Sequence, residues 1–347
     1  MDKRKVSVDI LKAICAVWVI LLHTIYGNWY DKLRMVFWAQ MAVPIFMILS
    51  GYTYTSSIRK KEIIGSIQWF SSHNMAPKIR RILIPYSMMF IVEVILQALT
   101  KSEKMNFIFA FLTGGWGPGA YYIPLLFQLL LIFPILYYTY QHNAMEGFCK
   151  VFALSVAVEY IFSVMGLSDL LYSRCISRYI VMIYLGIVLY EKGAIILKTL
   201  LPQMMFILGA AFIFFAGWLY KDYSAKLFNE DWFVTTAPSA LYVFPIVLWF
   251  IQCEPWFQNR KLAVWCAALG KASFHIYLVQ KAYFAFVYTR ILEIMSQYLP
   301  NNLLSACIEL IVNMAICVIV GMIFWMISRK IEQCFFGKSL IGKKKYK

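Results

Sequence analysis

The sequence predicts an all-α fold, a polytopic integral membrane bundle of about ten transmembrane helices with the N- and C-termini in the cytoplasm. Composition indicates the membrane, because 62% of the 347 residues are hydrophobic and 14% are charged, whereas soluble domains average about 45–50% and about 25%. The mean hydropathy is +0.68. Apolar runs recur from end to end, each long enough to cross a hydrocarbon layer about 30 Å thick. A soluble globular protein is therefore excluded, and so is an outer-membrane barrel, whose strands alternate in polarity.

The apolar runs also set the order of the predicted helices. The first run is rich in bulky residues and lacks a small-residue cleavage site, so we expect it to be retained as a membrane helix. The stretch 105–113 is too short to cross and is a candidate re-entrant or interfacial segment, and 178–191 is short for a span. We expect residues 1–335 to form a single transmembrane domain and residues 336–347 to form a basic cytoplasmic tail. The predicted spans are 9–28, 36–57, 81–99, 119–140, 150–167, 178–191, 197–220, 236–252, 263–289 and 303–328.

Lysine and arginine residues gather in three places, which are the first five residues, the segment 59–81 and the C-terminal tail. Cytoplasmic segments of membrane proteins are enriched in these residues, so all three places are predicted to be cytoplasmic. An even number of spans agrees with this orientation. We therefore interpret the net charge of +16 as a signal of orientation in a cell inner or plasma membrane and of contact with anionic lipids, and not of nucleic-acid binding.

The small residues of the chain suggest packing roles. Eight cysteines show no CxxC pair and fall mostly in or beside apolar runs, where a free cysteine behaves as a small hydrophobe. We expect neither a disulfide framework nor a metal site. Ser50 and Gly51 are small enough to let two membrane helices approach closely. No base can be assigned beside Ser50, which disfavours a catalytic serine there.

Ionisable residues at membrane depth mark candidate functional sites, because they usually face a cavity and have a partner. The first predicted helix holds Asp9, Lys12 and His23. Lys12 and His23 are eleven residues apart, which is three helical turns plus about 20°, so both lie on one face about 16 Å apart along the axis. Lys12 is then near the cytoplasmic interface, and His23 lies past the midplane.

His23 is the more informative of the two. An imidazole takes and gives a proton near neutral pH and can act as a nucleophile. The alternative for His23 is a hydrogen bond between helices without a chemical role. The alternative for Lys12 is a side chain that only reaches toward the interface.

Several motifs occur in the order found in a known family. Asp9 and Lys12, followed by His23, resemble the first helix of the membrane-bound acyltransferase 3 family, which has a basic residue, usually arginine, then ten positions and a histidine. The resemblance spans nearly the whole chain. Two positions depart from it, since Gln280 stands where many members have histidine and Cys334 where proline is common. The other matching segments are Phe46–Tyr52, Arg80–Tyr86, Gly119–Pro134, Arg178–Gly186 and Leu269–Leu278.

The resemblance implies an enzyme that transfers an acyl group, often acetyl, from cytosolic acyl-CoA to a hydroxyl group. The implied acceptor is a cell-envelope or extracellular glycan or a lipid-linked saccharide, so the implied process is polysaccharide modification by O-acetylation. Acyl-CoA, with acetyl-CoA expected, is then a co-substrate, and we expect no permanently bound cofactor.

The resemblance also suggests roles for individual residues. Arg80 and Arg81 have planar guanidinium groups that suit the phosphates of coenzyme A, and Lys12 adds a further charge. His23 is expected to deprotonate the acceptor hydroxyl or to carry the acyl group briefly. Asp9 is expected to pair with Lys12 on the same helix.

Two further groups of residues are candidates for the site. Trp116, Tyr121 and Tyr122 lie in or after a glycine-rich stretch on the predicted outer side, where they are candidates to bind the acceptor sugar. The alternative is an irregular entry to the fourth span. The acids Glu93, Glu159 and Glu309 are at membrane depth, and each is a candidate to orient His23.

Two other function classes remain open. A transporter or flippase of a polysaccharide intermediate, without catalytic activity, would also line its pathway with basic residues. No inverted repeat is visible, which disfavours this class. An inactive membrane subunit related to the enzymes is the other, and the presence of both Lys12 and His23 argues against it.

Overall fold

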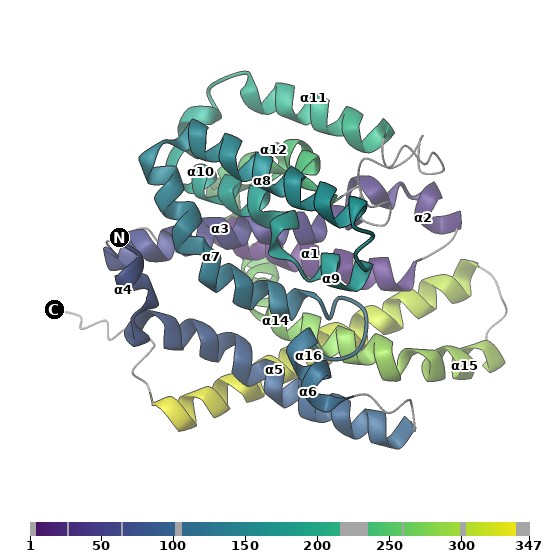
Figure 1. The fold of residues 1–347 in the computed structure, drawn as a ribbon. Coiled ribbons are helices and arrows are strands. Elements are labelled where there is room, and N and C mark those ends of the chain that lie inside the picture. The colour runs from purple at the N-terminus through teal and green to yellow at the C-terminus, as the bar shows by residue number, and fades with distance from the viewer. Residues whose placement is uncertain are drawn as a thin grey trace. The chain divides into compact units, whose positions relative to one another are not determined.

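The computed structural model describes residues 5–25, 28–63, 65–100, 106–215, 235–258, 260–298 and 303–337. Within these ranges the regular structure is entirely helical and contains no strand (Figure 1). The predicted all-α class is therefore confirmed. The last ten residues, which make up most of the predicted basic tail, lie outside the described residues.

Eight helical segments of the described chain are long and apolar enough to cross a membrane. They confirm a multi-pass membrane protein. Two shorter apolar helices, α11 (Leu201–Phe214) and Ala237–Gln252, which includes α12 (Ala240–Gln252), lie where the seventh and eighth spans are predicted. The eight are α1 (Val6–Thr24), Met35–Lys61 with α3 (Ala42–Lys61), α5 (Ser72–Thr100), α7 (Tyr122–His142), α8 (Ala144–Val164), Ile176–Ile196 with α10 (Ile180–Ile196), α14 (Lys261–Phe286) and Leu304–Phe335 within α16 (Leu303–Phe336).

Several helix boundaries differ from the predicted ones. Helix α5 begins nine residues before the predicted start at 81, so the helix also carries Lys78 and Arg80, which precede the predicted span. Hydropathy marks only the apolar part of a helix, and the backbone continues through Pro77 and Pro85, which membrane helices tolerate. The predicted short span 178–191 is part of a full-length helical segment, Ile176–Ile196.

Short helices connect the long ones. The predicted interfacial stretch 105–113 contains α6 (Phe107–Thr113), whose first turn is capped by the Asn106 side chain accepting hydrogen bonds from the Ile108 and Phe109 amides at 2.9 and 3.3 Å. The others are α2 (Asn28–Lys32), α4 (Ser66–Phe70), α9 (Asp169–Ser173), α13 (Glu254–Gln258) and α15 (Tyr288–Tyr298).

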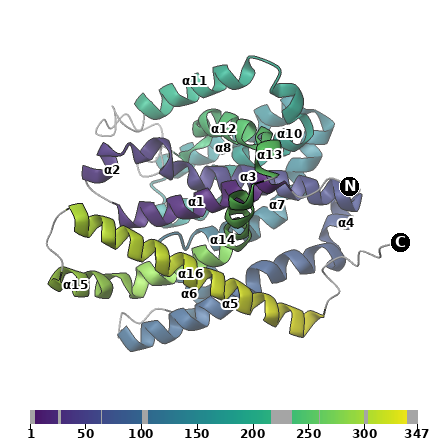
Figure 2. The same cartoon turned by 180° about the vertical axis from the view of Figure 1, so that it is seen from behind.

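The chain forms two compact units. Unit 1 contains Met1–Trp69 and Leu125–Lys271, and unit 2 contains Phe70–Pro124 and Ala272–Lys347. Helices α7 and α14 each contribute to both units. In unit 2, α16 runs alongside α15 and contacts α5 (Figure 2).

The core of unit 1 depends on a close approach of α3 and α10. A Cβ atom added to Gly51 would clash with the carbonyl group of Ile183, and one added to Gly186 would clash with the carbonyl oxygen of Ile48. The expectation that Gly51 allows close helix packing is therefore confirmed. Small residues serve this purpose in membrane proteins because lipid gives no hydrophobic drive for helices to associate, which leaves close packing as a main contribution.

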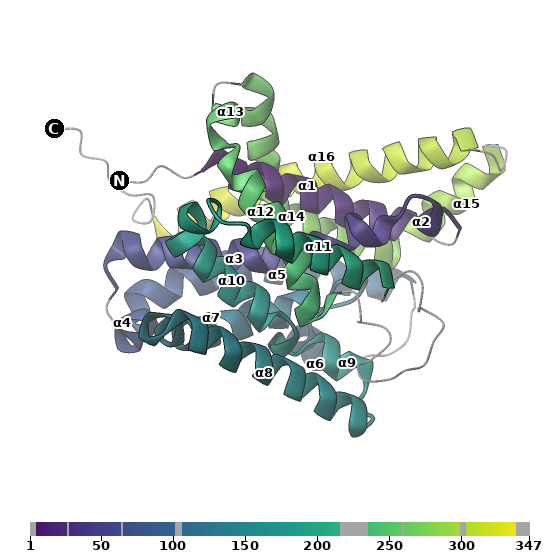
Figure 3. The ribbon, with the colours of Figure 1, turned by 90° about the horizontal axis from the view of Figure 1, so that it is seen from above.

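One end of unit 1 brings together several helix termini. The backbone amides of Val6 and Ser7 donate hydrogen bonds to the Glu254 carboxylate at 2.9 and 2.7 Å, so the start of α1 lies next to α13 (Figure 3). The Arg59 guanidinium donates to both carboxylate oxygens of Glu191 at 2.7 and 2.8 Å. Lys5 lies 5.9 Å from the ring centre of Tyr52. The start of α1 and the ends of α3, α10 and α12 therefore share one end of this unit.

Candidate active site

Helix α1 carries the residues singled out in the first predicted span. It is continuous from Val6 to Thr24, so Lys12 and His23 share one helix and one face, as their spacing predicts. Asp9 is buried, and Lys12 and His23 are half-buried. The helix ends four residues before the predicted boundary at 28. His23 is consequently in the last turn, about 26 Å along the axis from Val6 at 1.5 Å per residue.

The first part of α1 packs closely against α14. A Cβ atom added to Gly270 would clash with the backbone carbonyl of Asp9. Gly270 belongs to the segment Leu269–Leu278 that carries part of the family resemblance. Its lack of a side chain fixes the approach of the two helices next to Asp9, and therefore the position of the face that carries Lys12 and His23.

Arg80 and Arg81 lie in α5, within unit 2. Arg80 is half-buried, and its Nε donates a hydrogen bond to the Ala76 carbonyl at 3.2 Å. Arg81 is exposed. Consecutive residues of a helix differ by about 100° in direction, so the two guanidinium groups point to different sides of α5.

The predicted site residues thus fall into two groups. Asp9, Lys12 and His23 belong to unit 1. Unit 2 contains Arg80 and Arg81, which lie on α5, and the aromatic residues Trp116, Tyr121 and Tyr122.

A glycine-rich loop precedes α7 in unit 2. Four of its glycines, at positions 114, 115, 117 and 119, have φ between 83° and 100°, a left-handed conformation that side chains with a Cβ rarely adopt. A Cβ atom at Gly115 would collide with the side chains of Glu93 and Lys281. Glycine at this position therefore lets the backbone lie directly against two charged groups.

Glu93 and Lys281 form a buried ion pair beneath this loop. Lys281 Nζ lies 2.5 Å from Glu93 Oε1, and both side chains have an exposed fraction of 0%. Lys281 also donates a hydrogen bond to the Gly114 carbonyl at 2.7 Å. The Trp116 amide donates to Glu93 Oε2 at 3.2 Å. The pair therefore holds α5, α14 and the glycine-rich loop together.

Lys281 is not among the site residues predicted from the sequence, and Glu93 is predicted there only as a candidate partner for His23. The sequence does contain a signal that marks Lys281 as a candidate. Lys281 is an ionisable residue inside the predicted span 263–289, and such residues usually have a partner in membranes. Glu309, the second candidate acid of this unit, accepts a hydrogen bond from the Tyr288 hydroxyl at 2.7 Å. Glu159 is buried in α8 of unit 1 and interacts electrostatically with Arg178.

The aromatic residues of the loop are engaged with neighbouring rings. The Trp116 ring is stacked on Phe90 with centres 5.5 Å apart, and it meets Phe107 and Phe286 edge-on, each at 6.2 Å. The Tyr122 ring lies 5.2 Å from that of Tyr277, whose hydroxyl donates a hydrogen bond to the Gly119 carbonyl at 2.8 Å. Trp116 therefore contributes to the packing of the loop.

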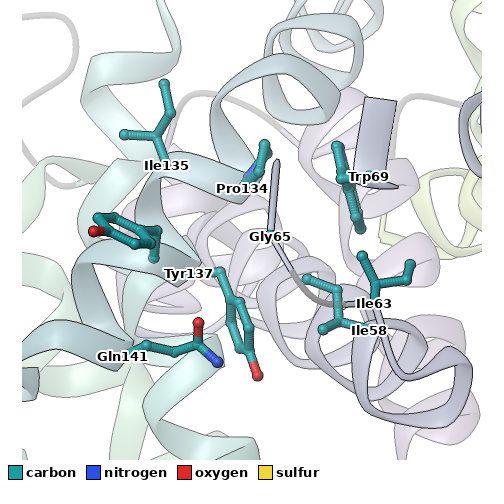
Figure 4. A pocket seen from close by; sticks show the side chains of 9 residues that line it. Ile58, Ile63, Gly65, Trp69, Pro134, Ile135, Tyr137 and Gln141 are labelled. Carbon is teal, nitrogen blue, oxygen red and sulfur yellow. The ribbon is translucent and has the colours of Figure 1, made fainter. Parts of the chain in front are cut away.

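Unit 1 contains a pocket of about 170 Å³ between the end of α3, α4 and the end of α7 (Figure 4). Its walls are mostly apolar and include Ile58, Trp69 and Pro134. An adjoining cavity of about 290 Å³ shares this wall and reaches Arg59 and Glu62. None of the predicted site residues lines either space.

A comparison with models of known protein families identifies the family of the chain. The family model of an acyltransferase domain, Acyl_transf_3, matches residues 5–325. The chain belongs to the acyltransferase 3 family. No curated protein and no solved structure matches it. The matched range covers α1 with His23, the glycine-rich loop and α14, so the resemblance seen in the sequence is confirmed, and the protein is a membrane acyltransferase.

Proposed function

We propose that this acyltransferase moves an acyl group, most simply acetyl, from cytosolic acyl-CoA to a hydroxyl of a cell-envelope or extracellular glycan. The observation that carries the proposal is the face of α1 with Lys12 and His23, in a chain that belongs to an acyltransferase family. A charged group near one end of a membrane helix and an imidazole near the other suit a reaction whose donor and acceptor come from opposite sides.

His23 is the proposed catalytic base. The acceptor hydroxyl oxygen attacks the thioester carbonyl carbon, its proton passes to the imidazole, the carbon–sulfur bond breaks, and coenzyme A leaves as a thiol once the sulfur regains a proton. In a variant of this mechanism the imidazole first takes the acyl group and then passes it to the hydroxyl. In both, the half-buried environment of His23 limits access of water, which would otherwise hydrolyse the thioester.

The donor is proposed to bind at the end of unit 1 where the start of α1 and the end of α3 meet. This end carries Lys5 and Arg59, which agrees with a cytoplasmic location. Lys12 supplies a positive charge along the same helix as His23, and Asp9 supports it. Arg80 and Arg81, on α5 of unit 2, are proposed separately as residues that bind the phosphates of acyl-CoA.

The test uses purified protein in lipid vesicles with acetyl-CoA that is radiolabelled in the acetyl group. The acceptors are short oligosaccharides released from the envelope of the producing cells. We expect label in the oligosaccharide in equal amount to the free coenzyme A thiol released. Binding or vesicle uptake of the oligosaccharide without incorporation of label would contradict the proposal and favour a transporter.

A further inference from the structure

Gln280 is a buried amide without a hydrogen-bond partner in the part of the chain that the structure describes. It lies on α14 with an exposed fraction of 1%, and neither its Oε1 nor its Nε2 is bonded. Gln128 shows the usual arrangement, since its Nε2 donates to the Arg174 carbonyl at 2.6 Å and its Oε1 accepts from the Ile176 amide at 3.0 Å. An amide with two open bonding positions inside a membrane helix is costly, because lipid offers no replacement partner.

The neighbours of Gln280 on α14 define the direction of its side chain. Tyr277, about 60° to one side, bonds the glycine-rich loop through its hydroxyl group and the Gly119 carbonyl. Ile276, about 40° to the other side, packs against Gly321 of α16. Gln280 is therefore directed between the loop and α16, within unit 2.

The charge that adjoins Gln280 along α14 is already compensated. Lys281, the next residue along α14, is bound to Glu93 and to the Gly114 carbonyl. An anionic ligand such as a coenzyme A phosphate would therefore find no uncompensated positive charge at Lys281. A neutral amide both donates and accepts hydrogen bonds, and so does a hydroxyl group. The chemistry of this place favours an uncharged, hydroxyl-bearing ligand.

We infer that the Gln280 side chain binds a hydroxyl group of the glycan acceptor and helps to select it. The inference rests on the proposed function and adds a specificity-determining residue to it. Gln280 takes no part in proton transfer or in binding the donor. Its open donor and acceptor are both used only when the acceptor is present.

The experiment compares three variants in the vesicle assay with envelope oligosaccharides and acetyl-CoA. Gln280→Leu removes both bonding groups at similar size, and Gln280→Asn keeps the amide. Gln97→Leu, at another buried glutamine of unit 2, is the matched control. We expect Gln280→Leu to raise the acceptor KM about 5- to 150-fold, the cost of losing two neutral hydrogen bonds. The KM for acetyl-CoA should stay the same, and the melting temperature should stay the same or rise.

An unchanged acceptor KM in Gln280→Leu, with a higher melting temperature, would overturn the inference and leave Gln280 as an unsatisfied packing residue. An equal rise in the acetyl-CoA KM would also overturn it. If Gln280→Leu does not fold, Gln280→Asn decides, since a shorter amide should still raise the acceptor KM. Measuring the binding of the oligosaccharides without acetyl-CoA separates the proposed reaction from the proposed role of Gln280. If the affinity depends on Gln280 but no acyl transfer is detected, only the proposed reaction is contradicted.

Discussion

Single side chains in this protein show how a membrane bundle accommodates charge. Glu93 and Lys281 are completely buried and contact each other and the backbone of the glycine-rich loop. Removing one partner of such a pair leaves an uncompensated charge, whereas removing both leaves two neutral groups. The Glu93–Lys281 pair therefore specifies how α5, α14 and the loop assemble, whatever its net contribution to stability.

The first prediction concerns this pair. Lys281→Met should lower the free energy of unfolding by about 3–5 kcal/mol. The double variant Glu93→Gln/Lys281→Met should recover much of that loss, because no charge remains buried. Denaturant unfolding in detergent, followed by tryptophan fluorescence, measures both. A loss that is equal in the single and double variants would show that Lys281 acts through packing alone.

The second prediction concerns Glu254, which joins α13 to the start of α1. Burial opposes its charge, but hydrogen bonds from Ser7 and from the Val6 amide outweigh burial and lower the pKa of the carboxyl below its usual value. A lowered folded-state pKa stabilises the protein above the unfolded pKa of about 4.3, and this stabilisation is lost as the pH falls through the folded value.

Glu254→Gln should therefore melt at a lower temperature than the wild type at pH 7, and the difference should shrink as the pH falls below about 4. Thermal unfolding of both proteins between pH 7 and pH 3 measures this. A difference that stays constant over the whole range would rule out a contribution from the ionised carboxylate.

At the scale of helices, glycine positions decide which elements meet. Gly51 and Gly186 allow α3 and α10 to touch, and Gly270 allows α1 to touch α14. Each position faces a neighbouring backbone, which cannot move without shifting a whole helix. The helix contacts next to Asp9 are for this reason sensitive to one added methyl group.

The third prediction tests this at Gly270. Gly270→Ala should destabilise the protein by about 1–3 kcal/mol, the usual cost of overpacking, and should reduce acyl transfer by displacing α1. Gly193→Ala on α10 is the matched control, because there the new Cβ meets only the ends of the Leu189 and Leu248 side chains, at 3.3 and 3.4 Å. A stability loss of equal size in both variants would mean that the contact with the Asp9 carbonyl is not the cause.

Sequence patterns predicted the existence of these helices better than their ends. Apolar runs predicted α1, α3, α7 and α16, since burial in lipid depends on composition. The start of α5 at Ser72 was missed, because charged residues at a helix end lower the hydropathy without breaking the helix. The registry of Lys12 and His23 needs only helical geometry and was predictable, while the contact of Lys281 with Glu93 joins residues 188 positions apart and depends on tertiary packing.

The molecule as a whole is a multi-pass acyltransferase with two compact units. In unit 1 the start of α1 lies beside α13, and the ends of α3 and α10 meet at Arg59 and Glu191. In a bundle whose helices alternate in direction across the membrane, the start of the first helix and the end of the second face the same side. The start of α1 and the end of α3 fit this pattern. The location of basic residues favours the cytoplasm for that side.

The fourth prediction tests this orientation by cysteine labelling. In a background with all native cysteines replaced by serine, Lys61→Cys should react with an impermeant maleimide only after the cells are permeabilised. Tyr298→Cys, at the exposed last residue of α15 and on the predicted outer side, should react on intact cells. Labelling of Lys61→Cys on intact cells would reverse the orientation and the side from which the donor enters.

A catalytic role of His23 predicts that the rate of acetyl transfer falls sharply in His23→Gln. Glutamine keeps the size and a hydrogen-bonding group but neither titrates near neutral pH nor forms an acyl-imidazole. At equal amounts of folded protein we expect the rate to fall about 10²- to 10⁴-fold, the usual contribution of general acid–base catalysis. His73→Gln, at an exposed histidine of α5, should keep the wild-type rate. A near-normal rate in His23→Gln would contradict a catalytic role and leave His23 as a structural contact between helices.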